Sequence, residues 1–176
     1  MKSAQACAIL LLAMSLHSCT TVSVQDYQER QPRLVMETFF DGRLGAQGVV
    51  KDFRGRVIRS FTADIQAYWR EGVGTLEEDF VFDDGEQQRR VWTLRPAGTG
   101  GYTGTAGDVV GEAEVSVAGN SVFLDYVLRI PYGDGSLDVR IDDRMYLVSP
   151  ELLINESVMR KFGVKVGEIL LTIYRE

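Results

Sequence analysis

The fold of this chain is decided by the stretch VIRSFTADIQAYW, residues 57–69. From Phe61 to Trp69 every second residue is apolar, whereas the residues between them include Thr, Asp and Gln. A repeat of two residues places apolar side chains on one face of a β-strand and polar side chains on the other. The stretch therefore predicts a strand with one buried and one wet face, as in antiparallel sheets.

The same repeat returns along the rest of the chain, in segments separated by short turn signals. Pairs such as Asp84-Gly85 and Asp134-Gly135 favour tight hairpins. Successive hairpins of this kind form an antiparallel meander. The pattern predicts strands over residues 43–52, 56–70, 75–83, 87–96, 102–107, 111–118, 121–132, 136–148 and 164–174.

A long meander exposes two strand edges unless the sheet closes on itself. We therefore expect an all-β, antiparallel up-and-down barrel of eight or nine strands, similar to that of a lipocalin. A two-sheet sandwich is the alternative, since strands of period two occur in both architectures. One short C-terminal helix is expected over residues 156–162, with Asn155 as its N-cap, and the strand over 164–174 is expected to return beneath it.

Several charged residues fall in phase with the apolar faces of the predicted strands. Two are arginines and two are acids, so we expect them to pair inside the barrel, because an unpaired buried charge is costly. They form either a structural network, with some charges at the barrel mouth, or a site in which Arg59 or Arg90 binds a ligand carboxylate. The candidate lumen and ligand-binding residues are Arg59, Trp69, Glu78, Arg90, Trp92 and Asp143.

The N-terminal segment has the features of a bacterial lipoprotein signal. Lys2 precedes a short apolar run, and the sequence LHSC at residues 16–19 matches a lipobox that ends on Cys19. The alternatives are a signal peptide cleaved elsewhere and a transmembrane helix, although the run is shorter than the ~20 residues that span a bilayer. We expect Cys19 to carry a lipid. Thr20 after it favours the periplasmic face of the outer membrane.

This leader divides the chain into three parts. We expect a signal peptide over residues 1–18, a lipidated polar tether over 19–33 and a single β-barrel domain over 34–176. The tether is expected to contribute nothing to the core, because it contains few apolar residues and no helical stripe.

The composition of the expected mature chain excludes several kinds of chemistry. His17 is the only histidine, and Cys7 is the only cysteine besides Cys19. Ser-His-Asp and Cys-His catalysis, His/Cys zinc sites and disulfides are therefore excluded. Without Lys2, 18 of the 19 basic residues remain against 25 acidic ones, a net charge of −7 that disfavours nucleic acid as a partner. We expect no metal, no cofactor and no catalytic residue.

A series of ordered motifs runs through the barrel region: GVVKDFRG at 48–55, EDFVFDDG at 78–85, RRVW at 89–92, YxGxAxDVVG at 102–111, AGN at 118–120, DDxMY at 142–146 and IN at 154–155. Together they resemble the DUF3833 family of proteobacterial lipoproteins, from about Leu34 to the C-terminus. The resemblance implies a lipoprotein of unknown function. Kinship with true lipocalins is a matter of fold only, because no Gly-x-Trp motif opens the first strand.

Two functions from different classes fit these observations. The first is a membrane-anchored binding protein that takes up an apolar ligand, such as a fatty acid or another lipid, in its barrel. The second is a structural or assembly lipoprotein that acts through its surface on another envelope protein. In both cases we expect a non-enzyme, and the width of the barrel lumen distinguishes the two.

Overall fold

The computed structural model describes residues 21–98 and 100–176. The expected signal peptide and Cys19 lie outside these residues, so the cleavage and lipidation sites remain predictions. Within the described residues, no helix is long and apolar enough to cross a membrane.

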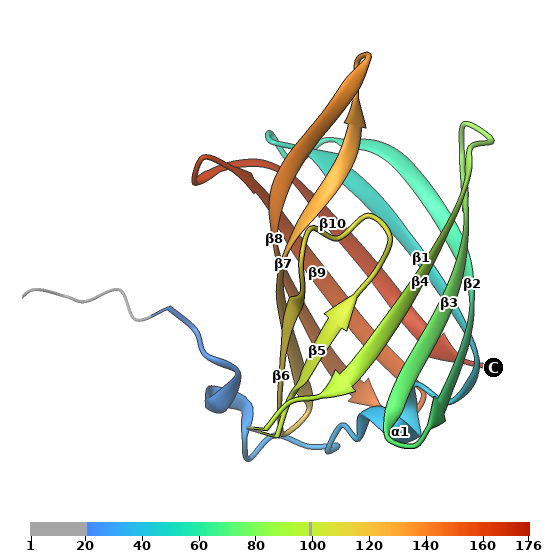
Figure 1. Cartoon of the computed structure of the whole chain (residues 1–176), viewed down its shortest axis with the longest axis vertical. Coiled ribbons are helices and arrows are strands. Elements are labelled where there is room, and N and C mark those ends of the chain that lie inside the picture. The colour runs from blue at the N-terminus through green and yellow to red at the C-terminus, as the bar shows by residue number, and fades with distance from the viewer. Residues whose placement is uncertain (1–20, 99) are drawn as a thin grey trace, which may run out of the picture.

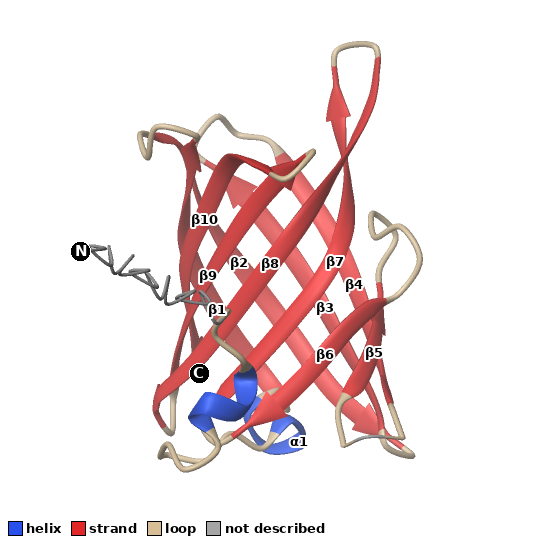
Figure 2. Ribbon diagram, turned by 90° about the vertical axis from the view of Figure 1, so that its left-hand side faces the viewer, coloured by secondary structure: helices blue, strands red, loops and turns tan. Residues whose placement is uncertain are grey.

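Ten antiparallel strands form one closed barrel (Figure 1, Figure 2). The last strand pairs with the first, with Leu44 opposite Arg175 and Asp52 opposite Gly167, so the sheet has no free edge. The predicted all-β antiparallel barrel is confirmed, and the sandwich alternative is wrong. The strands are β1 (Gly42–Asp52), β2 (Val57–Arg70), β3 (Val73–Phe82), β4 (Gln87–Pro96), β5 (Tyr102–Thr105), β6 (Ala113–Ala118), β7 (Ser121–Tyr132), β8 (Gly135–Ser149), β9 (Leu152–Lys161) and β10 (Val164–Arg175).

The predicted C-terminal helix is wrong, and so is the count of eight or nine strands. The segment expected to be helical forms most of β9, which pairs with β8 and β10. Its inward face carries the buried polar residues Asn155 and Ser157 next to Leu153. These polar residues occupy inward positions at which the two-residue repeat of a strand normally has apolar residues. For this reason the strand was not recognised in the sequence. β10 does not return under a helix; it closes the barrel against β1.

One end of the barrel is closed by α1 (Met36–Phe39), a single helical turn. The side chains of Met36, Phe39 and Phe40 are buried there. Arg175, at the end of β10, donates a hydrogen bond from Nη1 to the Phe39 carbonyl oxygen at 2.7 Å. Figure 2 shows the helical turns at this end, opposite the long hairpin of β7 and β8. The barrel is therefore plugged at the end where the N-terminal segment enters it.

The segment before the barrel is packed against the wall. Residues Val24–Tyr27 form a 3-10 turn, η1, in which Val24 is buried beside Phe123. The Tyr27 ring lies 5.7 Å from the Phe123 ring and 5.3 Å from the Tyr146 ring, measured between centroids. The expectation that this stretch stays unpacked is therefore wrong from Val24 onward, because two apolar side chains suffice to dock a short turn.

The wall between β4 and β7 is completed by a loop. β5 and β6 are short, so they cover only part of the gap between their neighbours. In the loop between them, Val110 donates its backbone N–H to the Val127 carbonyl at 2.8 Å, and Arg129 donates to the Asp108 carbonyl at 2.8 Å. These bonds fix the loop on β7 and hold Asp108 close to β4.

Candidate functional site

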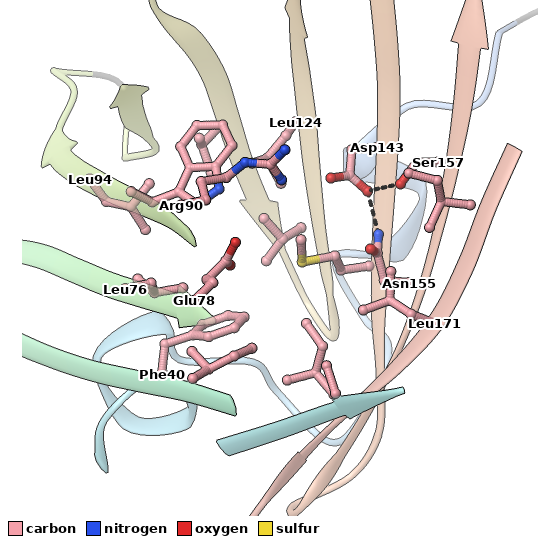
Figure 3. A pocket seen from close by; sticks show the side chains of 18 of the residues that line it. Phe40, Leu76, Glu78, Arg90, Leu94, Leu124, Asp143, Asn155, Ser157 and Leu171 are labelled. Carbon is pink, nitrogen blue, oxygen red and sulfur yellow. Dashed lines mark hydrogen bonds between the residues drawn. The ribbon is translucent and has the colours of Figure 1, made fainter. Parts of the chain in front are cut away.

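A cavity of about 120 Å³ lies inside the barrel (Figure 3). Its walls are mostly apolar, and Met36 and Phe40 of the α1 plug form its floor. The polar side chains that line it are Glu78, Arg90, Asp143, Asn155 and Ser157, together with the phenol of Tyr126. A mostly apolar pocket with a few convergent polar groups is the usual form of a small-molecule site.

Arg90 projects from β4 and pairs with Asp108. Its Nε lies 2.9 Å from Asp108 Oδ2, and its Nη2 lies 2.6 Å from the same oxygen. The Arg90 side chain is 22% exposed and that of Asp108 is 37% exposed. Burial lowers the pKa of Arg90, but the Asp108 hydrogen bond and nearby negative charges outweigh burial and raise it. The guanidinium therefore stays charged, and Asp108 neutralises it.

Glu78 projects from β3 directly opposite Arg90 in the strand register. The two side chains form no ion pair, and within residues 21–98 and 100–176 no hydrogen bond reaches the Glu78 carboxylate. Burial raises the pKa of Glu78 to about 7, against the opposing effect of the Arg90 charge. Asp143 and Asp108 raise this pKa further. A substantial fraction of Glu78 is therefore protonated near neutral pH.

Asp143 enters from β8 on the opposite wall, as Figure 3 shows. Its Oδ1 accepts hydrogen bonds from Asn155 Nδ2 and from Ser157 Oγ, the latter at 2.9 Å. Asp143 is 6% exposed, and burial raises its pKa although both hydrogen bonds lower it. Asn155 and Ser157, the polar side chains because of which β9 was not predicted, are thus the hydrogen-bond partners of a buried carboxylate.

Tyr126 of β7 lies between the two walls. It is 9% exposed, and its ring contacts Trp92 edge to face at 5.4 Å between centroids. Burial raises the pKa of Tyr126 well above its usual value, and the Asp143 charge adds to this effect. No hydrogen bond to its hydroxyl group is present among the described residues. The cavity therefore offers a neutral phenol beside two carboxyl groups.

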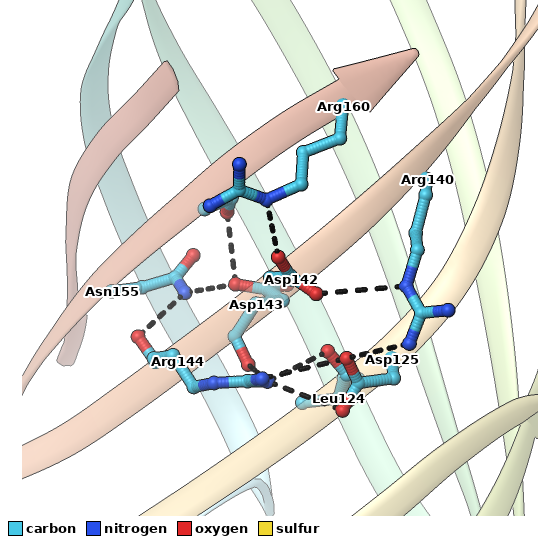
Figure 4. A network of polar contacts seen from close by, with 9 residues as sticks. Leu124, Asp125, Arg140, Asp142, Asp143, Arg144, Asn155 and Arg160 are labelled. Atoms are coloured by element: carbon cyan, nitrogen blue, oxygen red, sulfur yellow. Dashed lines mark hydrogen bonds and ion pairs between the residues drawn. The ribbon is translucent and has the colours of Figure 1, made fainter. Parts of the chain in front are cut away.

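A second polar network lies on the outer face of the same wall (Figure 4). Asp142 accepts a hydrogen bond from Arg160 Nε at 2.9 Å, and Arg144 Nη1 lies 3.4 Å from Asp125 Oδ2. The Arg144 backbone carbonyl also accepts a bond from Asn155 Nδ2 at 3.1 Å, which connects the outer network to the inner site. Exposed ion pairs contribute little individually. We interpret this network as support for the register of β7, β8 and β9.

Of the six residues singled out in the sequence, four line the cavity: Glu78, Arg90, Trp92 and Asp143. Arg59 does not. Its Nη2 binds Asp84 at 2.7 Å and Glu86 at 2.9 Å, and its guanidinium carbon lies 3.7 Å from the centre of the Phe82 ring. Trp69 is outside the cavity lining and donates from Nε1 to the Phe40 carbonyl at 2.8 Å, near the plugged end.

The expected mutual pairing of the four inward charges is wrong. Each arginine instead binds an acidic residue of a loop. Arg59 binds Asp84 in the turn after β3, and Arg90 binds Asp108 in the loop before β6. Loop residues have no strand phase, so the two-residue repeat could not reveal them. Sequence reasoning also missed Asn155 and Ser157 as site residues, whereas Tyr126 was expected among the bulky residues of the lumen and does line the cavity.

No group of three or more His, Cys, Asp or Glu side chains in the described part of the chain is arranged to hold a metal ion. The polar groups of the cavity are instead spread over opposite walls, with apolar surface between them. Such an arrangement suits an organic ligand with one polar group.

Comparison with known proteins identifies one matching family and several solved structures of similar fold. A family model described as a protein of unknown function, DUF3833, matches residues 13–175. The curated proteins contain no match. Seven chains of solved structures match. One is the S-type phycobiliprotein lyase CPES from Guillardia theta, with a TM-score of 0.50 and 14% identity over 82% of this chain and 94% of that chain. At this identity the likeness shows the fold alone, and the expectation of a non-enzyme stays a prediction.

Proposed function

The chain belongs to the DUF3833 family, and we propose that its barrel binds an apolar or amphiphilic small molecule. The observation that carries this proposal is the cavity, which combines apolar walls with a belt of buried polar groups. A barrel meant only as a scaffold gains nothing from burying Asp143 and leaving Glu78 half-buried in the same cavity, since charge removed from water costs stability. Strained or costly polar groups of this kind concentrate at functional sites.

The size of the cavity limits the ligand. An apolar cavity of about 150 Å³ accommodates benzene, so the 120 Å³ here accepts a small ring or a short alkyl segment. A long-chain fatty acid would have to widen the cavity or leave part of its chain outside. The proposed ligand therefore inserts a short apolar part.

We further propose that the protein is anchored by a lipid on Cys19 at the periplasmic face of the outer membrane. The docked turn η1 supports a particular geometry for this anchor. Cys19 precedes the buried Val24 by only five positions, which an extended chain spans in at most about 18 Å. The anchor would thus hold the plugged end of the barrel close to the lipid surface, where amphiphiles are available.

The binding proposal is tested by blocking the cavity. Ala46 of β1 is buried and lines the cavity, whereas the next residue, Gln47, is exposed. We expect short alkyl ligands to change Trp92 fluorescence saturably in the wild type and in Gln47→Phe, but not in Ala46→Phe. Ligand binding should also raise the melting temperature through linkage. The proposal fails if no alkyl or aromatic ligand gives a saturable signal, or if the blocked variant binds as well as the wild type.

A surface interaction has one observation in its favour. Phe162, at the turn between β9 and β10, is 92% exposed, and Phe53, after β1, is 59% exposed. Because β1 and β10 are neighbours, these two turns lie at the same end of the barrel. Phe162 also has a φ of 51°, a conformation that a bulky residue rarely adopts. Replacing both phenylalanines with Ser and measuring co-purification of envelope proteins tests this second candidate.

A further inference from the structure

The ligand of this cavity can be characterised further from the charges that face it. Glu78 and Asp143 point inward from opposite walls, and Arg90 is the one cation in the described lining. Three contacts of 2.6 to 3.1 Å commit the Arg90 guanidinium to Asp108. The positive charge is therefore already balanced, and at a pH above about 7, where Glu78 is mostly ionised, the two remaining carboxyl groups leave an excess of negative charge inside the barrel.

The carboxylate oxygens that have no hydrogen-bond partner lead to the same conclusion as the excess negative charge. Ser157 donates its hydroxyl hydrogen to Asp143 Oδ1, and Asn155 Nδ2 donates to Asp143 Oδ1 and to the Arg144 carbonyl. In the part of the chain that the structure describes, the Asp143 Oδ2 atom and both Glu78 oxygens receive no hydrogen bond. Carboxylate oxygens accept and do not donate. A ligand that contacts these oxygens must bring hydrogen-bond donors of its own, whereas the Tyr126 hydroxyl and Arg90 Nη1, which make no hydrogen bond within residues 21–98 and 100–176, are the donors that the lining offers.

Aromatic rings complete the surroundings of Glu78. Phe80, Trp92 and Tyr126 all line the cavity, and Tyr126 lies nine-tenths buried with an unbonded hydroxyl among the described residues. The face of an aromatic ring attracts a cation, and the effect grows when the cation is removed from water. Carboxylates combined with aromatic faces form a favourable site for an ammonium group and an unfavourable one for a carboxylate.

We propose that the barrel binds an amphiphile with a protonated amine head, and that Glu78 is the residue that recognises the ammonium group. This inference rests on the proposed ligand-binding function and differs from the carboxylate ligand that the sequence analysis named as one of two alternatives. The apolar part of the ligand packs against the cavity walls, and Asp143 adds a second negative charge from the facing wall.

A matched series of octyl compounds tests the proposal: n-octylamine, 1-octanol and octanoate differ only in their heads. Their binding to the wild-type protein is measured at pH 8 by isothermal titration calorimetry. We expect octylamine to bind at least tenfold more tightly than octanoate, with octanol between them. In Glu78→Gln the preference for the amine should fall at least tenfold. Glu77→Gln is the matched control, because Glu77 is the neighbour on the outer face and binds Arg89.

The outcomes separate this inference from the proposed function. Octanoate binding as tightly as octylamine to the wild type would overturn the amine proposal and leave ligand binding intact. An unchanged preference in a folded Glu78→Gln variant would overturn the role of Glu78. If none of the three compounds binds, the proposed function fails and this inference fails with it. The affinity order of the wild type requires no variant, so the test stands even if Glu78→Gln does not fold.

Discussion

The half-buried carboxyl of Glu78 should make the barrel less stable as the pH rises. Its pKa is about 7 in the folded protein, against an ordinary value of 4.5. Between these values the folded state binds more protons than the unfolded state, so the free energy of unfolding falls with increasing pH. The stabilisation is complete below pH 4.5 and is lost as the pH rises through 7. At about 1.4 kcal/mol per pKa unit, the difference amounts to about 3 kcal/mol.

Glu78→Gln isolates this effect, because glutamine does not titrate. Unfolding by urea is measured for both proteins at pH 5 and at pH 8.5. We expect the wild type to lose about 3 kcal/mol more than the variant between these two pH values. In thermal melts this corresponds to roughly 6 to 12 °C, given about 2 to 4 °C per kcal/mol in a chain of this size. Titrating groups that do not interact with Glu78 are present in both proteins and cancel.

Glu77→Gln provides the control in the same strand. Glu77 faces outward, where its Oε1 accepts a bond from the Tyr68 hydroxyl at 3.0 Å. This variant should keep the pH dependence of the wild type. If Glu78→Gln also keeps that dependence, Glu78 is solvated in the folded protein, and the cavity does not hold the raised Glu78 pKa on which this prediction rests.

Four other variants test three separate features of the protein. Arg90→Ala should destabilise the barrel by about 2 to 3 kcal/mol in urea unfolding, because it leaves Glu78 without its nearby cation. Arg59→Ala should cost less than about 1 kcal/mol, because the partners of Arg59 are at the exposed rim. Equal losses in the two variants would contradict this placement of the two arginines. Tyr27→Ala should cost about 1 to 2 kcal/mol through its lost ring contacts, and an unchanged unfolding midpoint would show that η1 does not stabilise the barrel. Cys19→Ala should release the protein from the membrane fraction with its fold intact by circular dichroism, and continued outer-membrane fractionation would refute the proposed anchor.

The strands that alternate cleanly were predictable because their chemistry is local. From Phe61 to Trp69 the buried side chains are all apolar, so the repeat of two is visible without any knowledge of neighbours. β7 and β8 were also predicted, with bounds that differ from the observed ones by no more than one residue, although β7 buries Ser121 and β8 buries Asp143 among their apolar residues. β9 was not predicted, because its inward residues Asn155 and Ser157 are polar. They donate hydrogen bonds to Asp143, which lies on another strand. Polar site residues at two successive inward positions thus interrupt the apolar repeat by which a strand is recognised.

The sequence by itself determined that the chain is all-β and antiparallel and that Glu78, Arg90, Trp92 and Asp143 share the apolar faces of their strands; closure into a barrel, and not a sandwich, was decided by the pairing of β1 with β10. Strand phase is a property of each segment alone, so composition and spacing suffice to state which side chains turn inward. Only the tertiary structure decided which of these charges meet. Asp108 reaches Arg90 through a loop pinned to β7, and this contact leaves Glu78 without a partner among the described residues. The charge left inside the barrel, and with it the kind of ligand it suits, therefore depends on contacts between segments far apart in the chain.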